Sequence, residues 1–253
     1  MKRLCLLIVF TFLFSACDPA PEEKGTISTC HKTVTAMSAL TSELKIPENF
    51  QTETPVKTGG EFNVMQYFTV LDHLSMQPGY ALDYVYHYDE MGGFPLLYVR
   101  LADQSPYTTE EELAAGGSST KYMDYIQADD TPESYFQVVL LATMGRQFYL
   151  YWHANYSDSQ VVCDRADVSD IVATLNGDYG YRISLPSRLR AALLANLAPS
   201  VVIGEQTVEV RLVSFTRWGG FYQETYTLNR SMPHAILDTQ EKNLVPYDCG
   251  IMF

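Results

Sequence analysis

The sequence predicts an α+β fold, in which a mostly antiparallel sheet built from hairpins is accompanied by four or five short helices. Two segments, 80–101 and 208–228, show strand-like alternation and reverse direction at a glycine pair, as β-hairpins do. Around them, apolar residues recur at helical spacing. Hydrophobic residues make up 47% of the 253 residues and charged residues 19%, which excludes a disordered chain. No shift of composition marks an internal boundary, so we expect residues 33–253 to form one globular domain.

The N-terminal third is predicted to contain two helices. Apolar residues at helical spacing predict one over 31–44, which ends before Pro47. The same spacing from Val64 to Leu74 predicts another over about 63–75, which Pro78-Gly79 stops. The polar segment 47–61 between them is predicted to be a loop.

The clearest strand signal lies at 80–89, where one face carries Tyr80, Leu82, Tyr84, Tyr86 and Tyr88. Residues 90–93 form a turn, and 94–101 return as the second strand. Thr109 followed by three glutamates then predicts a short helix that ends at Gly116-Gly117.

Residues 134–144 and 147–154 carry two conflicting signals. Thr131-Pro132 is typical of a helix start. The segments themselves are rich in aromatic and β-branched residues, which favour strands. We therefore predict a second hairpin here, with a helix as the alternative.

The C-terminal part is predicted to begin with helices over 167–177 and 185–197. The second has leucines on one face, with Pro186 near its start and Pro199 past its end. Strands at 208–212 and 221–228 follow, joined by a turn at Trp218-Gly219-Gly220.

The charge balance excludes one class of partner. Asp and Glu number 30 against 17 Lys and Arg, which gives a formal net charge of -13. Binding to a phosphate backbone needs a basic surface. We therefore expect no nucleic-acid partner.

The first seventeen residues form an export signal. A basic start, Lys2-Arg3, precedes an apolar run from Leu4 to Phe14, about half of the roughly 20 residues that a spanning helix needs. Phe14-Ser15-Ala16-Cys17 resembles the lipobox of bacterial lipoproteins, although Phe14 stands where that family usually has Leu.

This resemblance implies that residues 1–16 are a signal peptide and that Cys17 is lipidated. The protein would then be extracytoplasmic and anchored to a bacterial membrane through its lipid, without a transmembrane helix. Residues 17–32 are predicted to be a flexible tether, because they begin with two prolines and several charges and lack apolar periodicity.

Three cysteines remain besides Cys5 and Cys17. In a protein outside the cytoplasm, where disulfides can form, we expect one disulfide and one free thiol. We predict a bond between Cys163 and Cys249, with Cys30 as the alternative partner of Cys249. The reason is the apolar C-terminal tail, which a bridge would pin against fraying. Three buried free thiols are the competing possibility.

No motif indicates a metal or a cofactor. The five histidines form neither HExxH nor HxH, no CxxC pair exists, and no phosphate-binding glycine loop appears. We expect no metal and no cofactor. His87, Asp89 and His153 are candidates for a hydrolytic site, because His87 and Asp89 share a strand face and His153 lies near a strand end.

Tyrosine is unusually frequent, with 18 residues against 2 tryptophans. Tyr84, Tyr86 and Tyr88 on one strand face, and Trp218 at a hairpin tip, are candidate binding residues, because such rings suit stacking and interfaces. The favoured alternative for the tyrosines is a face covered by other parts of the chain. For Trp218, an exposed position and one folded back over its glycines are equally open.

Two classes of function remain from the sequence. The first is a tethered lipoprotein with a non-catalytic binding or structural role, toward a protein or small-molecule ligand that the sequence does not identify. The second is a tethered hydrolase with a His/Asp site. An exposed Tyr/Trp patch would favour the first, and a concave pocket with His and Asp within hydrogen-bond reach would favour the second.

Overall fold

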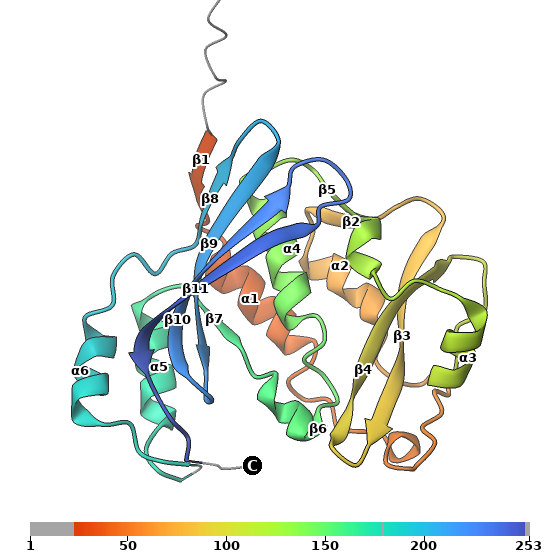
Figure 1. Cartoon of the computed structure of the whole chain (residues 1–253), viewed down its shortest axis with the longest axis horizontal. Helices are drawn as coiled ribbons and strands as arrows, with labels where there is room; N and C mark the ends of the chain where they lie inside the picture. Colours follow the sequence, from red (N-terminus) through yellow and green to blue (C-terminus); the bar gives the residue numbers. More distant parts are fainter. Residues whose placement is uncertain (1–22, 179, 251–253) are drawn as a thin grey trace, which may run out of the picture.

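The computed structural model describes residues 23–178 and 180–250 (Figure 1). Within them lie six α-helices and eleven strands, and every strand pair is antiparallel. The α+β prediction is confirmed.

A six-stranded sheet contains most of the C-terminal half. Its order is β1 (Glu23–Thr26), β8 (Ser200–Ile203), β9 (Thr207–Thr216), β10 (Gly220–Asn229) and β11 (Ile236–Pro246). β7 (Gln160–Val162) also pairs with β9, beyond the part of β9 that β8 occupies. The predicted hairpin at 208–228 is β9–β10, whose register pairs Thr216 with Gly220.

Two smaller sheets contain most of the other strands. The predicted tyrosine-rich hairpin is β3 (Tyr80–Asp89) with β4 (Gly92–Leu101), extended by β6 (Tyr151–Trp152). β2 (Leu74–Met76) pairs with β5 (Ile126–Ala128). The helix predicted over 63–75 is therefore wrong in its second half: a 3₁₀ turn at Val64–Gln66 and α2 (Tyr67–Val70) are followed by β2, which finds its ladder partner in β5.

The predicted hairpin at 134–154 is also wrong, because residues Pro132–Met144 form the helix α4. Thr131 caps it, accepting a hydrogen bond from Ser134 N, and Pro132 occupies its first turn. Residues 134–141 are all buried. A helix buried on all sides is apolar on all sides, so it lacks the amphipathic pattern and its β-branched residues resemble a strand.

The other four helices begin within two residues of their predicted starts, but two of them, predicted over 31–44 and 185–197, end five residues earlier than predicted. These four helices are α1 (Cys30–Ala39), α3 (Glu110–Gly116), α5 (Arg165–Thr174) and α6 (Leu185–Ala192). Short 3₁₀ turns occur at Glu48–Phe50, Tyr122–Tyr125 and His153–Tyr156.

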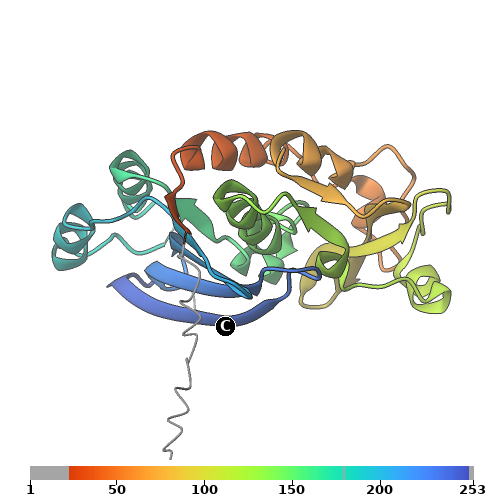
Figure 2. The same cartoon turned by 90° about the horizontal axis from the view of Figure 1, so that it is seen from above.

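Helix α4 occupies the middle of the molecule. Figure 2 shows it between the large sheet on one side and the layer of α1 and α2 on the other. Its residues belong to a hydrophobic cluster that includes side chains from all three sheets, among them Leu74, Tyr84 and Val210. A second cluster packs α5 and the segment after it against β7, β9 and β11.

The folded part begins earlier than the sequence predicts. Residues 23–26 of the expected tether form β1, whose partner is β8, and Ile27 is buried. Cys17 and the residues predicted to be a signal peptide lie outside the described residues.

The disulfide joins Cys30 to Cys163, with 5.7 Å between the Cα atoms, and Cys249 is a buried free thiol. The predicted Cys163–Cys249 bond, and its Cys30–Cys249 alternative, are therefore wrong. The tail is docked without a bridge: Tyr181 N donates to Cys249 O at 3.0 Å, and Tyr247 OH donates to Tyr181 O at 2.7 Å. Cys30 is the first residue of α1, so its bond fixes α1 to the segment just before α5.

The pairing can be tested by unfolding in urea with and without reductant. The bond links residues 133 positions apart, so reduction should lower the free energy of unfolding by about 2–4 kcal/mol. The Cys30→Ser/Cys163→Ser variant should be insensitive to reductant, while Cys249→Ser should keep the wild-type sensitivity. Loss of that sensitivity in Cys249→Ser would show that Cys249 takes part in the bond.

Candidate functional site

A polar cavity of about 520 Å³ lies where β2 and β5 meet the loop after β10. Its ionisable lining residues are Asp72, His73, Asp129, Asp130, Tyr135, Arg230 and His234. These residues come from three distant parts of the chain, which the short β2–β5 ladder and the start of α4 bring together.

The ladder positions the first pair of groups. Leu74 pairs with Ala128, so His73 and Asp129, one residue outside this pair, lie next to each other. His73 Nδ1 is 2.7 Å from Asp129 Oδ2. Thr131, the cap of α4, donates its hydroxyl to Asp129 Oδ1 at 2.6 Å and so orients the carboxylate.

The hydrogen bond to Asp129 changes the pKa of His73. The hydrogen bond to Asp129 raises the pKa of His73 above its usual value, against the opposing effect of burial. The other ring nitrogen, Nε2, lies 4.0 Å from Asp72 Oδ1, beyond a hydrogen bond. An imidazole held by a carboxylate at Nδ1 in this way can use Nε2 toward a ligand or a substrate.

Asp130 and Arg230 are a second pair of charged groups that line the cavity. Arg230 holds Asp130 through two hydrogen bonds, Nε to Oδ1 at 2.9 Å and Nη2 to Oδ2 at 2.7 Å. Tyr135 OH also donates to Asp130 Oδ1, at 2.7 Å. The Arg230 hydrogen bonds are the main reason why the pKa of Asp130 is lowered. The ring of the buried His234 lies edge-on to Tyr135.

The cavity is negatively charged. Asp72, Asp129 and Asp130 contribute three carboxylates, and the pKa of each is lowered, so all are ionised at neutral pH. Arg230 supplies one positive charge, which is committed to Asp130, and His73, whose pKa is raised, adds a second beside Asp129 when it is protonated. The remaining negative charge and the polar walls suit a small ligand that carries a positive charge.

A second cavity, of about 390 Å³, is lined by charged side chains that already form ion pairs with one another. Lys57 and Arg100 both bond to the buried Asp83, and Lys57 Nζ lies 4.3 Å from the centroid of the Tyr84 ring. Lys57 also donates to Tyr84 O at 3.3 Å, so it covers the outer edge of β3. These bonds attach the 57–63 loop to the hairpin, and they account for the charges without a ligand.

Glu61 holds the 57–63 loop in place by accepting hydrogen bonds from Thr58 and Asn49. Burial acts to raise its pKa, but hydrogen bonds from Thr58 and Asn49 outweigh that effect and lower the pKa to about 2. A group with a lowered pKa stabilises the fold above its unfolded-state pKa, and the contribution is lost as the pH falls toward about 2. Glu61 is therefore a structural carboxylate.

The structure brings the predicted catalytic residues only partly together. His87 bonds to Glu110 through Nδ1 at 2.7 Å and to Asp89 through Nε2 at 3.2 Å, so both ring nitrogens are occupied. Burial lowers the pKa of His87, but the two carboxylates more than compensate and the net shift is upward. Because both ring nitrogens are bonded to carboxylates, neither is left to accept a proton from a substrate. His153 lines a shallow cavity with Asp89 and is bonded to Tyr156 through Nδ1.

The tyrosine face is part of the core, so Tyr84 and Tyr86 are not binding residues. Tyr84 is 0% exposed and Tyr86 2%, and Tyr86 stacks on Phe50 with ring centroids 4.4 Å apart. Tyr88 is half-buried against Tyr151. The alternative of a covered face is confirmed, because the 3₁₀ turn at Glu48–Phe50 and α2 lie over it.

Trp218 is half-buried and packs against the second hydrophobic cluster. Its ring meets that of Tyr156 edge-on, with centroids 4.2 Å apart. It is therefore not an exposed contact residue at the hairpin tip.

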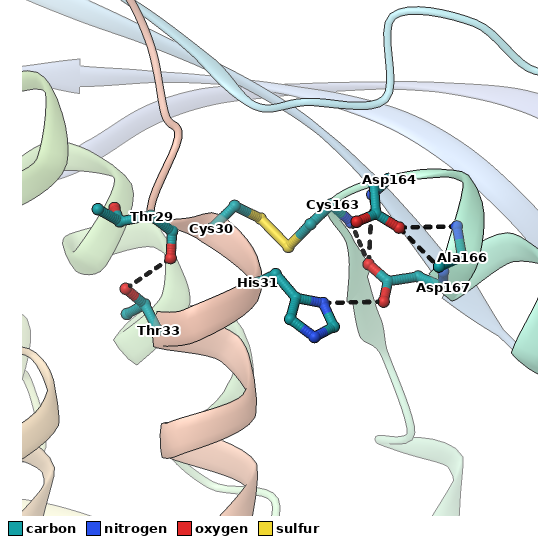
Figure 3. Close-up of a disulfide and its surroundings, with 8 residues drawn as sticks. All are labelled: Thr29, Cys30, His31, Thr33, Cys163, Asp164, Ala166 and Asp167. Atoms are coloured by element: carbon teal, nitrogen blue, oxygen red, sulfur yellow. Dashed lines mark hydrogen bonds and ion pairs between the residues drawn. A yellow bond between two sulfur atoms is a disulfide. The ribbon is translucent and has the colours of Figure 1, made fainter.

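Among the residues that the structure describes, one group has donors close enough to hold a metal ion: His31, Asp164 and Asp167 (Figure 3). They lie beside the Cys30–Cys163 disulfide. Asp164 caps α5 through one oxygen, which accepts from Ala166 N and Asp167 N. Asp167 accepts from Cys163 N and Asp164 N through one oxygen and faces His31 Nδ1 at 3.2 Å with the other. Helix capping and an exposed ion pair explain this arrangement without a metal.

The sequence did not single out the acidic cavity. Asp72-His73 was predicted to lie in a helix, where adjacent residues face different ways, and His234 carried no motif. The pairing of β2 with β5, which creates the His73–Asp129 contact, joins two three-residue strands too short for an alternation signal.

A scan against protein-family models finds no match to this chain, and neither do searches of curated proteins and of solved structures. Within residues 23–178 and 180–250, no helix is both long and apolar enough to cross a bilayer.

Proposed function

We propose that this chain is an extracytoplasmic lipoprotein, attached to a bacterial membrane through Cys17, and that its folded domain binds a small positively charged ligand. The observation that carries the binding role is the acidic cavity around His73, Asp129 and Asp130.

Two features support the location. The export signal ends in Phe14-Ser15-Ala16-Cys17, as in the lipobox. The Cys30–Cys163 disulfide suits an oxidising compartment, since disulfides persist mainly outside the cytoplasm.

The charges of the cavity support an amine as the ligand. Asp72 and Asp129 present carboxylates that are more than two-fifths exposed, while the carboxylate of Asp130 is held by Arg230. A primary or quaternary ammonium group in the cavity, beside Asp72 and Asp129, would meet two negative charges, with His73, Tyr135 and His234 forming part of the wall.

The His73–Asp129 pair supports a second candidate, a tethered hydrolase. A carboxylate that holds Nδ1 of a histidine leaves Nε2 to accept a proton, as a general base must. Ser75 and Ser231 line the same cavity, so a hydroxyl nucleophile is available within it.

Lipidation is tested by expressing the full chain in bacteria with labelled palmitate, beside the Cys17→Ser variant. The wild-type chain should take up label and the variant should not, because Cys17 would be the acylated residue. The Cys5→Ser variant is the matched control and should be labelled like the wild type. Equal labelling of the Cys17→Ser chain would contradict the proposal.

Ligand binding is tested by following the histidine resonances while ethanolamine, choline and spermidine are added. At least one of these amines should shift the His73 signals and leave those of His87 unchanged. Binding should strengthen as the pH rises through the raised pKa of His73, because deprotonation removes a positive charge from the cavity. Asp129→Asn should weaken binding, whereas Asp89→Asn, the control, should not.

An activity assay distinguishes the amine-binding protein from the hydrolase. Turnover of a chromogenic ester, amide or phosphate that is lost in His73→Gln but kept in His31→Gln would establish the hydrolase instead. The absence of any shift at His73 with all three amines would contradict the proposed ligand class.

A further inference from the structure

Helix α6 carries an uncovered apolar stripe. Leu185, Leu189 and Leu193 are 70%, 58% and 79% exposed, and they follow one another at four-residue intervals. The sequence predicted that these leucines and Leu197 line one face of a helix, but α6 ends at Ala192 and, of the four, only Leu197 is buried. The face of α6 that packs on the domain is instead occupied by Ala191 and the half-buried Leu194.

Arginines lie on both sides of this stripe. At about 100° per residue, Arg188 and Arg190 fall roughly 100° to either side of its centre. Both are exposed, and so is Arg182, just before the helix. Residues 180–204 contain these three arginines and no acidic residue, in a chain whose net charge is -13.

The stripe belongs to a well-anchored helix. Ser184 caps its start by accepting from Ser187 N at 3.2 Å. Arg165, from α5, donates to Ala192 O and, at 3.0 Å, to Leu194 O, so it satisfies carbonyls at the other end. The leucines are therefore presented by a fixed helix, and Figure 1 places α6 at one end of the long axis of the molecule.

We propose that α6 docks on the surface of an anionic phospholipid bilayer, with the three leucines inserted among the acyl chains and the arginines at the phosphates. A short helix with one apolar face and arginines beside it is typical of helices that lie in the membrane interface. Tyr181, 64% exposed at the start of the helix, is a residue type enriched at that depth.

The inference rests on the proposed function, since attachment through Cys17 would hold the domain at a bilayer. Five residues separate Cys17 from Glu23 in β1, so the chain between them can reach at most roughly 22 Å. β1 pairs with β8, which follows α6 after residues 193–199, so Cys17 and α6 are linked to neighbouring strands, with Glu23 opposite Ile203 and Thr26 opposite Ser200.

The charge of α6 favours a bilayer over a second copy of the chain. In a two-fold dimer through this face, the arginines of one copy would meet those of the other, which is unfavourable. Anionic headgroups offer the opposite charge along the whole stripe.

The test uses the full chain with an environment-sensitive fluorophore at Leu189→Cys. Cys30 and Cys163 are bonded and Cys249 is buried, so labelled wild-type protein gives the background. In vesicles that contain phosphatidylglycerol, the emission of the label should shift to shorter wavelength. The control, Leu237→Cys, replaces a leucine that is 54% exposed on β11 and should show no shift.

Two double variants separate the contribution of the leucines from that of the arginines. Leu185→Gln with Leu193→Gln should abolish the shift, and Arg188→Gln with Arg190→Gln should remove its dependence on phosphatidylglycerol. An unchanged emission at position 189 in anionic vesicles would overturn the inference. So would a shift that appears without vesicles as the protein concentration rises, which would indicate a second copy as the partner.

Palmitate uptake, measured on the same preparations, separates this inference from the proposed function. Protein that takes up palmitate but shows no shift at position 189 refutes only the docking of α6. Protein without palmitate that shifts when anionic vesicles are added refutes the anchor and supports the docking.

Discussion

The burial of α4 on all sides is the constraint on which the rest of the structure depends. A helix with no exposed face must be covered all round, and here the large sheet covers one side and the layer of α1 and α2 covers the other. Side chains from the three sheets meet in the cluster around α4. The disulfide strengthens the arrangement, because it fastens the start of α1 to the chain just after β7, at the edge of the large sheet.

The same helix determines where the candidate site lies. A buried helix must still satisfy the N–H groups of its first turn, and here Thr131 and Ser134 do so in a capping box. Asp129 and Asp130 immediately precede that cap, so they are held at the surface on rigid backbone beside the β2–β5 ladder. The core thus positions an acidic cavity, and we connect that cavity to the binding of a cation. The exposed leucines of α6 belong to the other end of the molecule and serve a different purpose in our account, contact with the membrane.

The sequence predicted the hairpins and helices whose pattern lies within one short stretch of the chain. The β3–β4 and β9–β10 hairpins alternate with period two and close on glycines. In the first of them, Gly92 has a φ of 140°, and a Cβ there would lie 2.4 Å from Tyr151 O. Helices α3 and α5 carry cap residues and acidic first turns. Helix α4 was only the alternative prediction for its segment, because total burial removes the periodicity by which helices are recognised.

The pairing of elements distant in sequence could not be predicted. The Cys30–Cys163 bond depends on where α1 lies relative to β7, and the His73–Asp129 contact depends on two strands of three residues each. The leucines of α6 were correctly placed on one face, but periodicity does not reveal whether a face is covered. Tyr84 and Tyr86 illustrate the converse, since residue types common at interfaces here fill the core.

Native-state hydrogen exchange tests the central role of α4 most directly. If α4 is held from all sides, the amides of residues 138–141 should exchange only through global unfolding, with a free energy equal to that of the whole domain. The amides of the β3–β4 hairpin should exchange at the same free energy or a lower one. Exchange of the α4 amides through local opening, at a lower free energy than the amides of β9 and β10, would contradict this account.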